Sequence, residues 1–267
     1  MKPQMLRQPA VAGLFYPEDA DELRRTVTAF VGPASGARLR LGVVAPHAGY
    51  VYSGKVAGKV YAATEIPERV VVLAPNHTGR GEDRALWARG AFVVPGGRVP
   101  VDEELAARLL EAGVVSDDQE AHRREHALEV QLPFLLARRS TVRVTPLVLG
   151  RLDYSECQAL GETLAAVAPP GTLVVASSDM NHYLDDQTTR VRDRVALAPL
   201  MALDARGLHE TVLREDISMC GFIPATVMLA FARARGAKSA ELVDYATSGD
   251  VFGERDRVVG YAGVVIN

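Results

Sequence analysis

The sequence predicts an α/β fold: a single domain over residues 1–267, with a mostly parallel central sheet flanked by helices. The first observation is that several strand-forming runs, such as 41–46 and 69–75, are continuously apolar, which is typical of strands buried on both faces of a parallel sheet. The second is that these runs alternate with helical stretches almost throughout the chain. A hydrophobic content of 48% over 267 residues supports one large core, so we expect one domain.

The first half of the chain alternates strand and helix signals. Acidic residues at 18–22 precede an apolar stripe that ends at Phe30, so a helix begins here with negative charge that suits its dipole. The stretch 85–94 alternates apolar and polar residues, which predicts a strand exposed on one face. The expected elements are therefore the first helix, strands at 41–46 and 69–75 with a helix between them, the strand near 85–94, and a helix at about 102–112.

The second half continues the alternation. Polar residues at 117–126 lead into a helix-like run at 127–139, in which Pro133 is a kink or an early helical position. Apolar runs at 142–150 and 172–178 predict two further buried strands. The remaining expected elements are helices at 154–168, 187–204 and 221–235 and a last pair of strands at 241–246 and 258–266.

Charge and composition exclude several classes of protein. The net charge is −3, the pI is about 6.1 and no block of like charge stands out, so we expect no nucleic-acid partner. No stretch approaches the length of a membrane span, and residues 1–17 lack the apolar core of a signal peptide. Two cysteines are too few for a disulfide framework. We therefore expect a soluble, cytoplasmic protein.

Three of the strand-forming runs are followed within a few positions by a histidine: His47, His77 and His182. In open α/β sheets the ligand site lies just outside the carboxyl ends of the strands, where the connecting loops converge. Imidazoles are common ligands of zinc, iron and copper and common acid–base groups. A buried, hydrogen-bonded structural histidine is the alternative for each one alone. Together they predict a metal or acid–base site at one sheet edge.

Two further residues belong to this prediction. Asp179 precedes His182 by three residues, so its carboxylate could orient the imidazole or join a metal shell; the alternative is that it caps the next helix. Cys220 lies just before a predicted helix, where the thiol pKa is expected to be lowered, which favours a ligand or nucleophile over a small buried hydrophobe. Cys157, inside a predicted helix, is expected to be inert.

Two short patterns are set aside. Residues 49–56 nearly match a phosphate-binding P-loop, but Val56 stands where a hydroxyl would hold magnesium. Residues 122–126 fit the H-x-x-E-H pattern of inverted zinc peptidases, yet such short patterns arise by chance. His209 stands alone in a helical stretch and is expected at the surface.

An ordered series of motifs runs nearly from end to end of the chain. The motifs are AVAGLFYP near residue 10, APHAGYVYSG at 45–54, APNHTG at 74–79, EHALEVQLPFL at 125–135, SSDMNHY at 177–183, MCGFIP at 219–224, TSGDVFG at 247–253 and VVGYAGVVI at 258–266. This series resembles the Memo family, also called AmmeMemoRadiSam system protein B. The resemblance implies a fold like that of the class III extradiol dioxygenases, with a metal site at matching positions. It implies His47, His77 and Cys220 as metal ligands and Asp179 and His182 as catalytic groups in the same pocket, which we expect Tyr16, Glu125 and His126 to line as well.

Cys220 stands where the dioxygenases carry a carboxylate ligand, and a thiolate shifts metal preference toward softer ions. We expect a divalent transition metal, with iron first and copper or zinc as alternatives. Two functions follow: a metal-dependent redox enzyme acting on a small molecule, or a binding protein that holds a peptide or partner in the same cleft, with Phe15 and Tyr16 near its mouth. The family name further implies AMMECR-like and radical SAM partner proteins. The substrate is not identified by the sequence.

Overall fold

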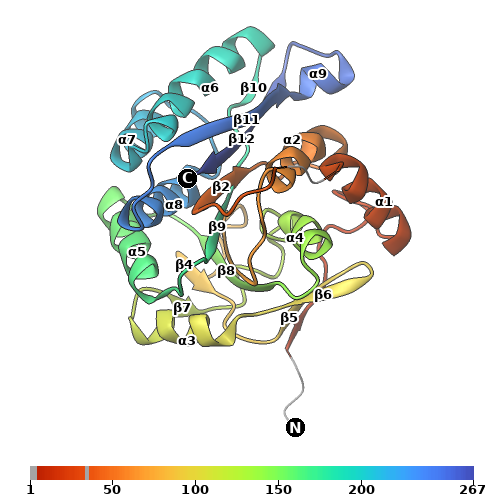
Figure 1. Ribbon diagram of the computed structural model, residues 1–267. Coiled ribbons are helices and arrows are strands. Elements are labelled where there is room, and N and C mark those ends of the chain that lie inside the picture. Colours follow the sequence, from red (N-terminus) through yellow and green to blue (C-terminus); the bar gives the residue numbers. More distant parts are fainter. Residues whose placement is uncertain (1–4, 34–35) are drawn as a thin grey trace.

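A computed structural model describes residues 5–33 and 36–267 of the chain; residues 1–4 and 34–35, which the predicted domain includes, lie outside this description. The centre is a nine-stranded sheet with helices on both faces (Figure 1). Its strand order is β10 (His182–Leu184), β12 (Val258–Ile266), β2 (Gly42–Ala45), β9 (Leu173–Ser177), β3 (Arg69–Pro75), β8 (Arg143–Leu149), β4 (Arg84–Leu86) and β7 (Ser116–Asp117), and β11 (Ala240–Thr247) pairs with β12.

The middle of the sheet is parallel. Strands β2, β9, β3 and β8 are neighbours that run in one direction, and Val43, Val175 and Val72 lie in register across three of them. Their apolar runs are buried on both faces, as the continuous hydrophobic pattern predicts. The α/β prediction is confirmed. Parallel pairing does not extend across the whole sheet, because β12 is antiparallel to β2, β10 and β11, and β4 is antiparallel to β8.

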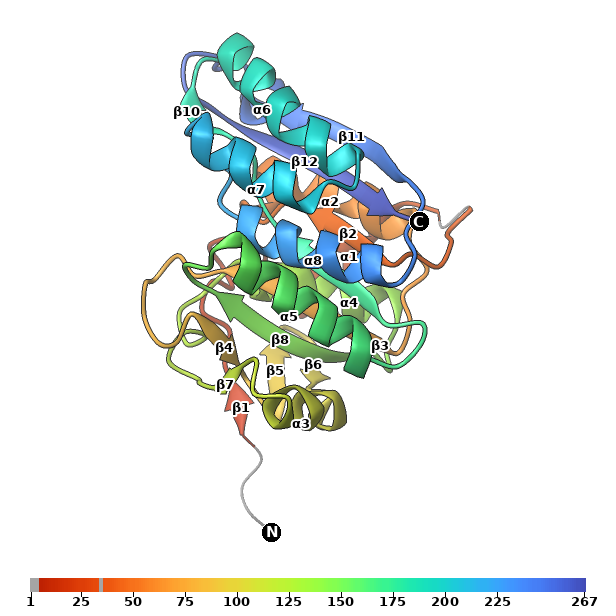
Figure 2. The same ribbon diagram turned by 90° about the vertical axis from the view of Figure 1, so that its left-hand side faces the viewer.

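Helices cover the two faces of the sheet in separate layers, which lie on either side of the sheet in Figure 1, and Figure 2 looks onto one of these layers. One layer contains α3 (Glu103–Glu111), α5 (Tyr154–Val167), α6 (Asp186–Met201), α7 (Ala205–Arg214) and α8 (Phe222–Ala234), and α8 packs directly on β2, β3 and β9. The opposite layer contains α1 (Ala20–Val31), α2 (Tyr50–Ala62) and α4 (Leu132–Arg138). The short η1 (Glu129–Gln131) precedes α4, and α9 (Ser248–Phe252) joins β11 to β12.

Helix starts follow the capping residues in the sequence. Asp19, Asp102 and Asp153 each accept a backbone N–H at the start of a helix, and Asp153 forms a capping box with Glu156. The predicted helix at 127–139 is shorter than expected and begins with the single turn of η1. The helix predicted at 187–204 ends at Met201 and is followed by α7.

The stretch predicted as one strand near 85–94 is divided between two sheets. Its first part is β4, whereas β5 (Ala91–Val94) forms a three-stranded sheet with β1 (Leu6–Arg7) and β6 (Gly97–Pro100). The break is at Gly90, whose φ is +90° and where an added Cβ would lie 1.9 Å from the carbonyl oxygen of Met5. The chain can turn between the sheets here because this position has no side chain.

The position of His209 differs from the prediction. The expected surface position of His209 is wrong: the residue is only 6% exposed, and its Nε2 lies 3.1 Å from the carbonyl oxygen of Leu152. The apolar face of α7 that carries it packs on α8, so the helix turns its histidine inward.

Among the described residues, none of the helices has the length and apolar character needed to cross a bilayer.

Candidate metal centre

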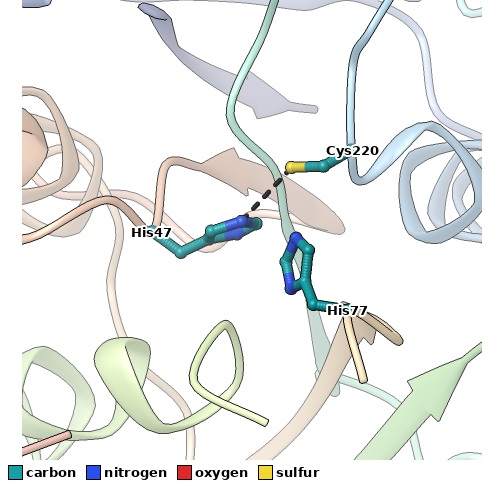
Figure 3. A group of neighbouring side chains, drawn as sticks. All are labelled: His47, His77 and Cys220. Carbon is teal, nitrogen blue, oxygen red and sulfur yellow. Dashed lines mark hydrogen bonds between the residues drawn. The ribbon is translucent and has the colours of Figure 1, made fainter. Parts of the chain in front are cut away.

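Three side chains from distant parts of the sequence meet at the carboxyl edge of the sheet. His47 follows β2, His77 follows β3, and Cys220 precedes α8. The nearest ligand atoms of the three lie within 4.8 Å of one another, and Cys220 Sγ is 3.2 Å from His47 Nε2. Figure 3 shows the two imidazoles and the sulfur converging on one point. The predicted convergence is present, while the role of these residues as ligands stays a prediction.

The imidazole of His47 is held in one tautomer by buried hydrogen bonds. Ser177 Oγ donates to the carbonyl of Ala127 at 2.7 Å and accepts from Gln131 Nε2 at 2.8 Å. Because its single proton is used, the 2.9 Å contact between Ser177 Oγ and His47 Nδ1 must be donated by the ring. His47 therefore carries its proton on Nδ1 and turns the lone pair of Nε2 toward Cys220.

Glu125 fixes the tautomer of His77 in the same way. Its Oε1 accepts from His77 Nδ1 at 2.9 Å and its Oε2 accepts from the backbone N–H of the same residue at 2.7 Å. Although burial opposes ionisation, the hydrogen bonds from His77 and from the backbone N–H of Ala127 hold the pKa of Glu125 at about 2. A carboxylate that fixes the far nitrogen of an imidazole is the usual arrangement behind a metal-binding histidine.

The thiol of Cys220 is protonated in the metal-free protein, contrary to the prediction of a lowered pKa. Burial raises the pKa of Cys220, and the negative charge of Asp179 raises it further. These two effects outweigh the lowering of the pKa that is expected from the position of Cys220 near the start of α8 and from the backbone N–H of Asp179, which donates to Sγ at 3.3 Å. A metal bound here would displace the thiol proton, as is general for cysteine ligands.

His47 is also neutral. Burial lowers its pKa well below the ordinary value, and the neighbouring His77 and His126 lower it further. The site thus offers two imidazole nitrogens and one thiol, a set suited to zinc, copper or iron. A second group, His77 with Glu125 and His126, is less suitable because Oε1 of Glu125 already accepts from His77 and from the N–H of Ala127.

Asp179 does not orient His182, as the sequence suggests, nor does it cap the next helix. Its Oδ1 accepts the backbone N–H groups of His47 at 2.8 Å and Ala48 at 3.3 Å, and the N-cap of α6 is Asp185. Burial raises the pKa of Asp179. The residue therefore fixes the turn that carries one proposed ligand, and its own N–H contacts the sulfur of another.

A wide pocket opens over these groups, with a volume of about 1030 Å³. His47, His77, His126, Asp179, His182 and Cys220 all line it. The expected position of Tyr16 is wrong: it is 3% exposed, is absent from the pocket wall, and its hydroxyl donates to Glu129, whereas Phe15, expected beside it, does line the pocket. Glu125 lies behind His77 rather than in the wall.

Sequence reasoning missed the residues that orient the histidines. Gln131 and Ser177 lie within apolar runs, so the sequence did not predict that Ser177 contacts the His47 ring or that Gln131 donates to Ser177. The polar glutamine among EVQLPF was the available signal, because a buried amide requires partners. The H-x-x-E-H pattern does not form a site, since His122 points to the carbonyl of Ala85, away from the pocket that His126 lines.

We predict that Glu125→Gln lowers metal affinity by about 10- to 100-fold, the usual cost of losing an outer hydrogen-bond partner. The amide would turn an N–H toward one of the three donors that the carboxylate now accepts. Competition with a chelator of known affinity measures the change. Glu120→Gln, an exposed neighbour on the same segment, serves as the control, and equal affinities in both variants would remove Glu125 from this role.

The chain is similar to known proteins over almost its whole length. Residues 7–265 match the family described as Memo-like protein. A MEMO1 family protein of Aquifex aeolicus is 38% identical over 97% of this chain and 98% of its own length. Another, from Methanopyrus kandleri, is 42% identical over 98% of this chain and 99% of its own length. The crystal structure of an uncharacterized protein from Escherichia coli K12 covers 85% of this chain and all of its own, with a TM-score of 0.57 and 16% identity, which shows a shared fold alone.

Proposed function

The chain belongs to the Memo-like protein family, and from this premise we propose that it is a metal-dependent redox enzyme acting on a small molecule in a dioxygenase-like pocket. The observation that supports the proposal is the donor set itself. His47 and His77 are each fixed with the proton on Nδ1, so that Nε2 is available beside the sulfur of Cys220. We propose iron as the metal, with copper and zinc as alternatives, because all three accept imidazole and thiolate ligands.

A bound iron or copper ion would supply electron transfer and polarisation of a coordinated group. The chain itself would bind and orient the substrate. His182 lines the pocket with Nδ1 already hydrogen-bonded to the carbonyl of Ser218, which leaves Nε2 to accept a proton from a bound substrate. Phe15 packs against His126, with ring centroids 4.7 Å apart, and adds an apolar surface to the pocket wall.

Metal analysis after anaerobic purification tests the proposal. We expect about one iron or copper per chain, together with oxygen uptake that depends on an added small molecule. Absence of stoichiometric metal in freshly purified protein, combined with failure of the apo-protein to take up iron, copper or zinc, would contradict it.

A second candidate function is the binding of a peptide or a partner protein. It is favoured by the aromatic side chains at the pocket mouth, where Tyr52, Tyr183 and Phe252 are 42%, 62% and 58% exposed. Partner proteins of the AMMECR-like and radical SAM types are the candidates that the family resemblance implies. Binding that persists after removal of all metal would favour this function over catalysis.

We predict that Cys220→Glu shifts metal preference toward ferrous iron, because it creates the two-histidine, one-carboxylate set that suits this ion. Competitive loading of the wild-type and variant proteins with equal concentrations of iron, copper and zinc measures the preference. Cys157→Ala is the control, since that thiol is buried within α5. Unchanged selectivity in Cys220→Glu would show that residue 220 does not contribute a ligand.

A further inference from the structure

We infer that Asn181 and Ser218 are positioning residues that lock His182 in the Nδ1–H tautomer and tie it to the loop that carries Cys220. The inference rests on the proposed function, in which His182 Nε2 accepts a proton from the substrate. We call the hydrogen-bonded group of His182, Ser218, Asn181 and Asp193 the His182 clamp.

His182 is held at two points by one residue. Its backbone N–H donates to Ser218 Oγ at 2.8 Å, and its Nδ1 lies 2.8 Å from the carbonyl oxygen of Ser218. A carbonyl can only accept, so the imidazole must carry its proton on Nδ1. Neutral His182 therefore presents an acceptor, not a donor, to the pocket that it lines.

Ser218 is exposed to the pocket, and its hydroxyl and backbone are held by hydrogen bonds to the buried Asn181. Asn181 Oδ1 accepts from Ser218 Oγ at 3.2 Å and, at 3.4 Å, from its backbone N–H. The backbone N–H of Asn181 in turn donates to Asp193 Oδ1 at 2.8 Å, and Asp193 Oδ2 accepts from the hydroxyl of Tyr245 at 2.6 Å. The clamp thus runs from the pocket wall into the interior, where Asn181 and Asp193 are 2% and 0% exposed.

The backbone around the clamp is strained. Only three non-glycine residues in the described part of the chain have positive φ, and two of them flank the clamp: Tyr183 at 63° and Asp216 at 50°. A bulky tyrosine rarely adopts this conformation, and the pairing of β10 with β12 is irregular at the same place. Strain of this kind persists only where surrounding contacts enforce it, and it concentrates at functional sites.

Asn181 provides a second indication that the clamp is kept at an energetic cost to the fold. Its Nδ2 is buried and has no hydrogen-bond partner within residues 5–33 and 36–267. An unpaired buried amide is unfavourable, so a residue that served packing alone would be better replaced by an apolar one. The unpaired Nδ2 is offset by the two hydrogen bonds that Oδ1 accepts from Ser218, and Ser218 in turn holds His182.

The clamp also connects the proton acceptor to a proposed metal ligand. Ser218 and Cys220 are separated by one residue on the loop between α7 and α8. Any displacement of this loop that moves the sulfur also moves the carbonyl that fixes His182. The tautomer of His182 and the position of Cys220 are therefore set together.

Nuclear magnetic resonance of protein with isotope-labelled histidine tests the inference, with and without one equivalent of Zn²⁺. Long-range proton–nitrogen correlations identify which ring nitrogen carries the proton, and the His182→Gln protein assigns the signals. We expect wild-type His182 to be protonated on Nδ1. Ser218→Ala and Asn181→Ala should each lower the ratio of the Nδ1–H to the Nε2–H tautomer by about three- to tenfold, the effect of weakening one or two hydrogen bonds.

Two controls separate positioning from general loosening. Ser218→Thr keeps the hydroxyl and should keep the wild-type ratio. Thr64→Ala removes a hydroxyl as buried as Asn181, one that donates to the carbonyl of Val60 and lies far from His182 in the sequence, and should also leave the ratio unchanged. Wild-type His182 protonated on Nε2, or unchanged ratios in both alanine variants, would overturn the inference. A wild-type protein that shows the expected tautomer but binds no metal would retain the clamp and refute the proposed function.

Discussion

Replacing His47 with alanine should lower the affinity of the protein for iron or copper by more than about 100-fold, since losing a ligand costs more than losing the outer partner of one. The variant removes one of two imidazole donors and leaves Cys220 without its nearest nitrogen, now 3.2 Å from Sγ. Metal content after anaerobic reloading and gel filtration measures the loss. Circular dichroism of the same sample establishes that the variant is folded.

His182→Ala is the matched control, because it removes another pocket imidazole that lies outside the proposed ligand set. We expect this variant to retain most of its metal. If the wild-type protein turns over a substrate, its activity should fall by about 10² to 10⁴-fold, the usual contribution of a positioned acid–base group. Equal metal loss in the two variants would place His182 among the ligands, and full activity would leave it a structural role only.

The sequence predicted the convergence at the site because topology determines it. His47 and His77 follow strands that each pair with β9 in the parallel part of the sheet, so their loops leave at the same edge. This argument requires only strand direction and order. Continuous apolar runs that alternate with helices favour parallel neighbours, and here that expectation holds for β2, β9 and β3.

The chemistry within the site could not be predicted in the same way. Cys220 lies before a helix, which by itself favours thiolate, but burial reverses the direction of the pKa shift, and burial depends on the complete fold. Asp179 was expected to contact His182, its near neighbour in sequence, whereas it accepts from His47, which is 132 residues away. Hydrogen bonds between distant segments leave no periodic pattern in a sequence.

The mixed sheet shows a related limit. The apolar run of β12 reads as a buried strand, and it is one, but its direction depends on how β11 and α9 return the chain to the sheet. A strand that pairs antiparallel on both sides can be as apolar as a parallel one when helices cover both of its faces. The pattern therefore predicts burial more reliably than direction.

The last prediction concerns the buried ion pair of Arg7 and Glu129, whose side chains are 3% and 0% exposed. Arg7→Leu should destabilise the protein by about 3–5 kcal/mol, because it leaves the carboxylate of Glu129 buried without its counter-charge. Arg7 also donates to the carbonyls of His122, at 3.0 Å, and Glu125, at 2.6 Å, which would lose their partner. Denaturant unfolding, with the midpoint and slope compared with the wild type, measures the loss.

An exposed pair provides the contrast. Arg24 and Asp21 on α1 are 71% and 66% exposed, so Arg24→Leu should change the free energy of unfolding by less than about 1 kcal/mol. Because Arg7 holds the backbone of the segment that carries Glu125, we also expect Arg7→Leu to weaken metal binding under conditions where the variant remains folded. Similar small losses of stability in both variants would show that Glu129 is compensated by its other donors, the N–H groups of Ala10 and Val11 and the hydroxyl of Tyr16, and that Arg7 does not hold the N-terminal segment against the site.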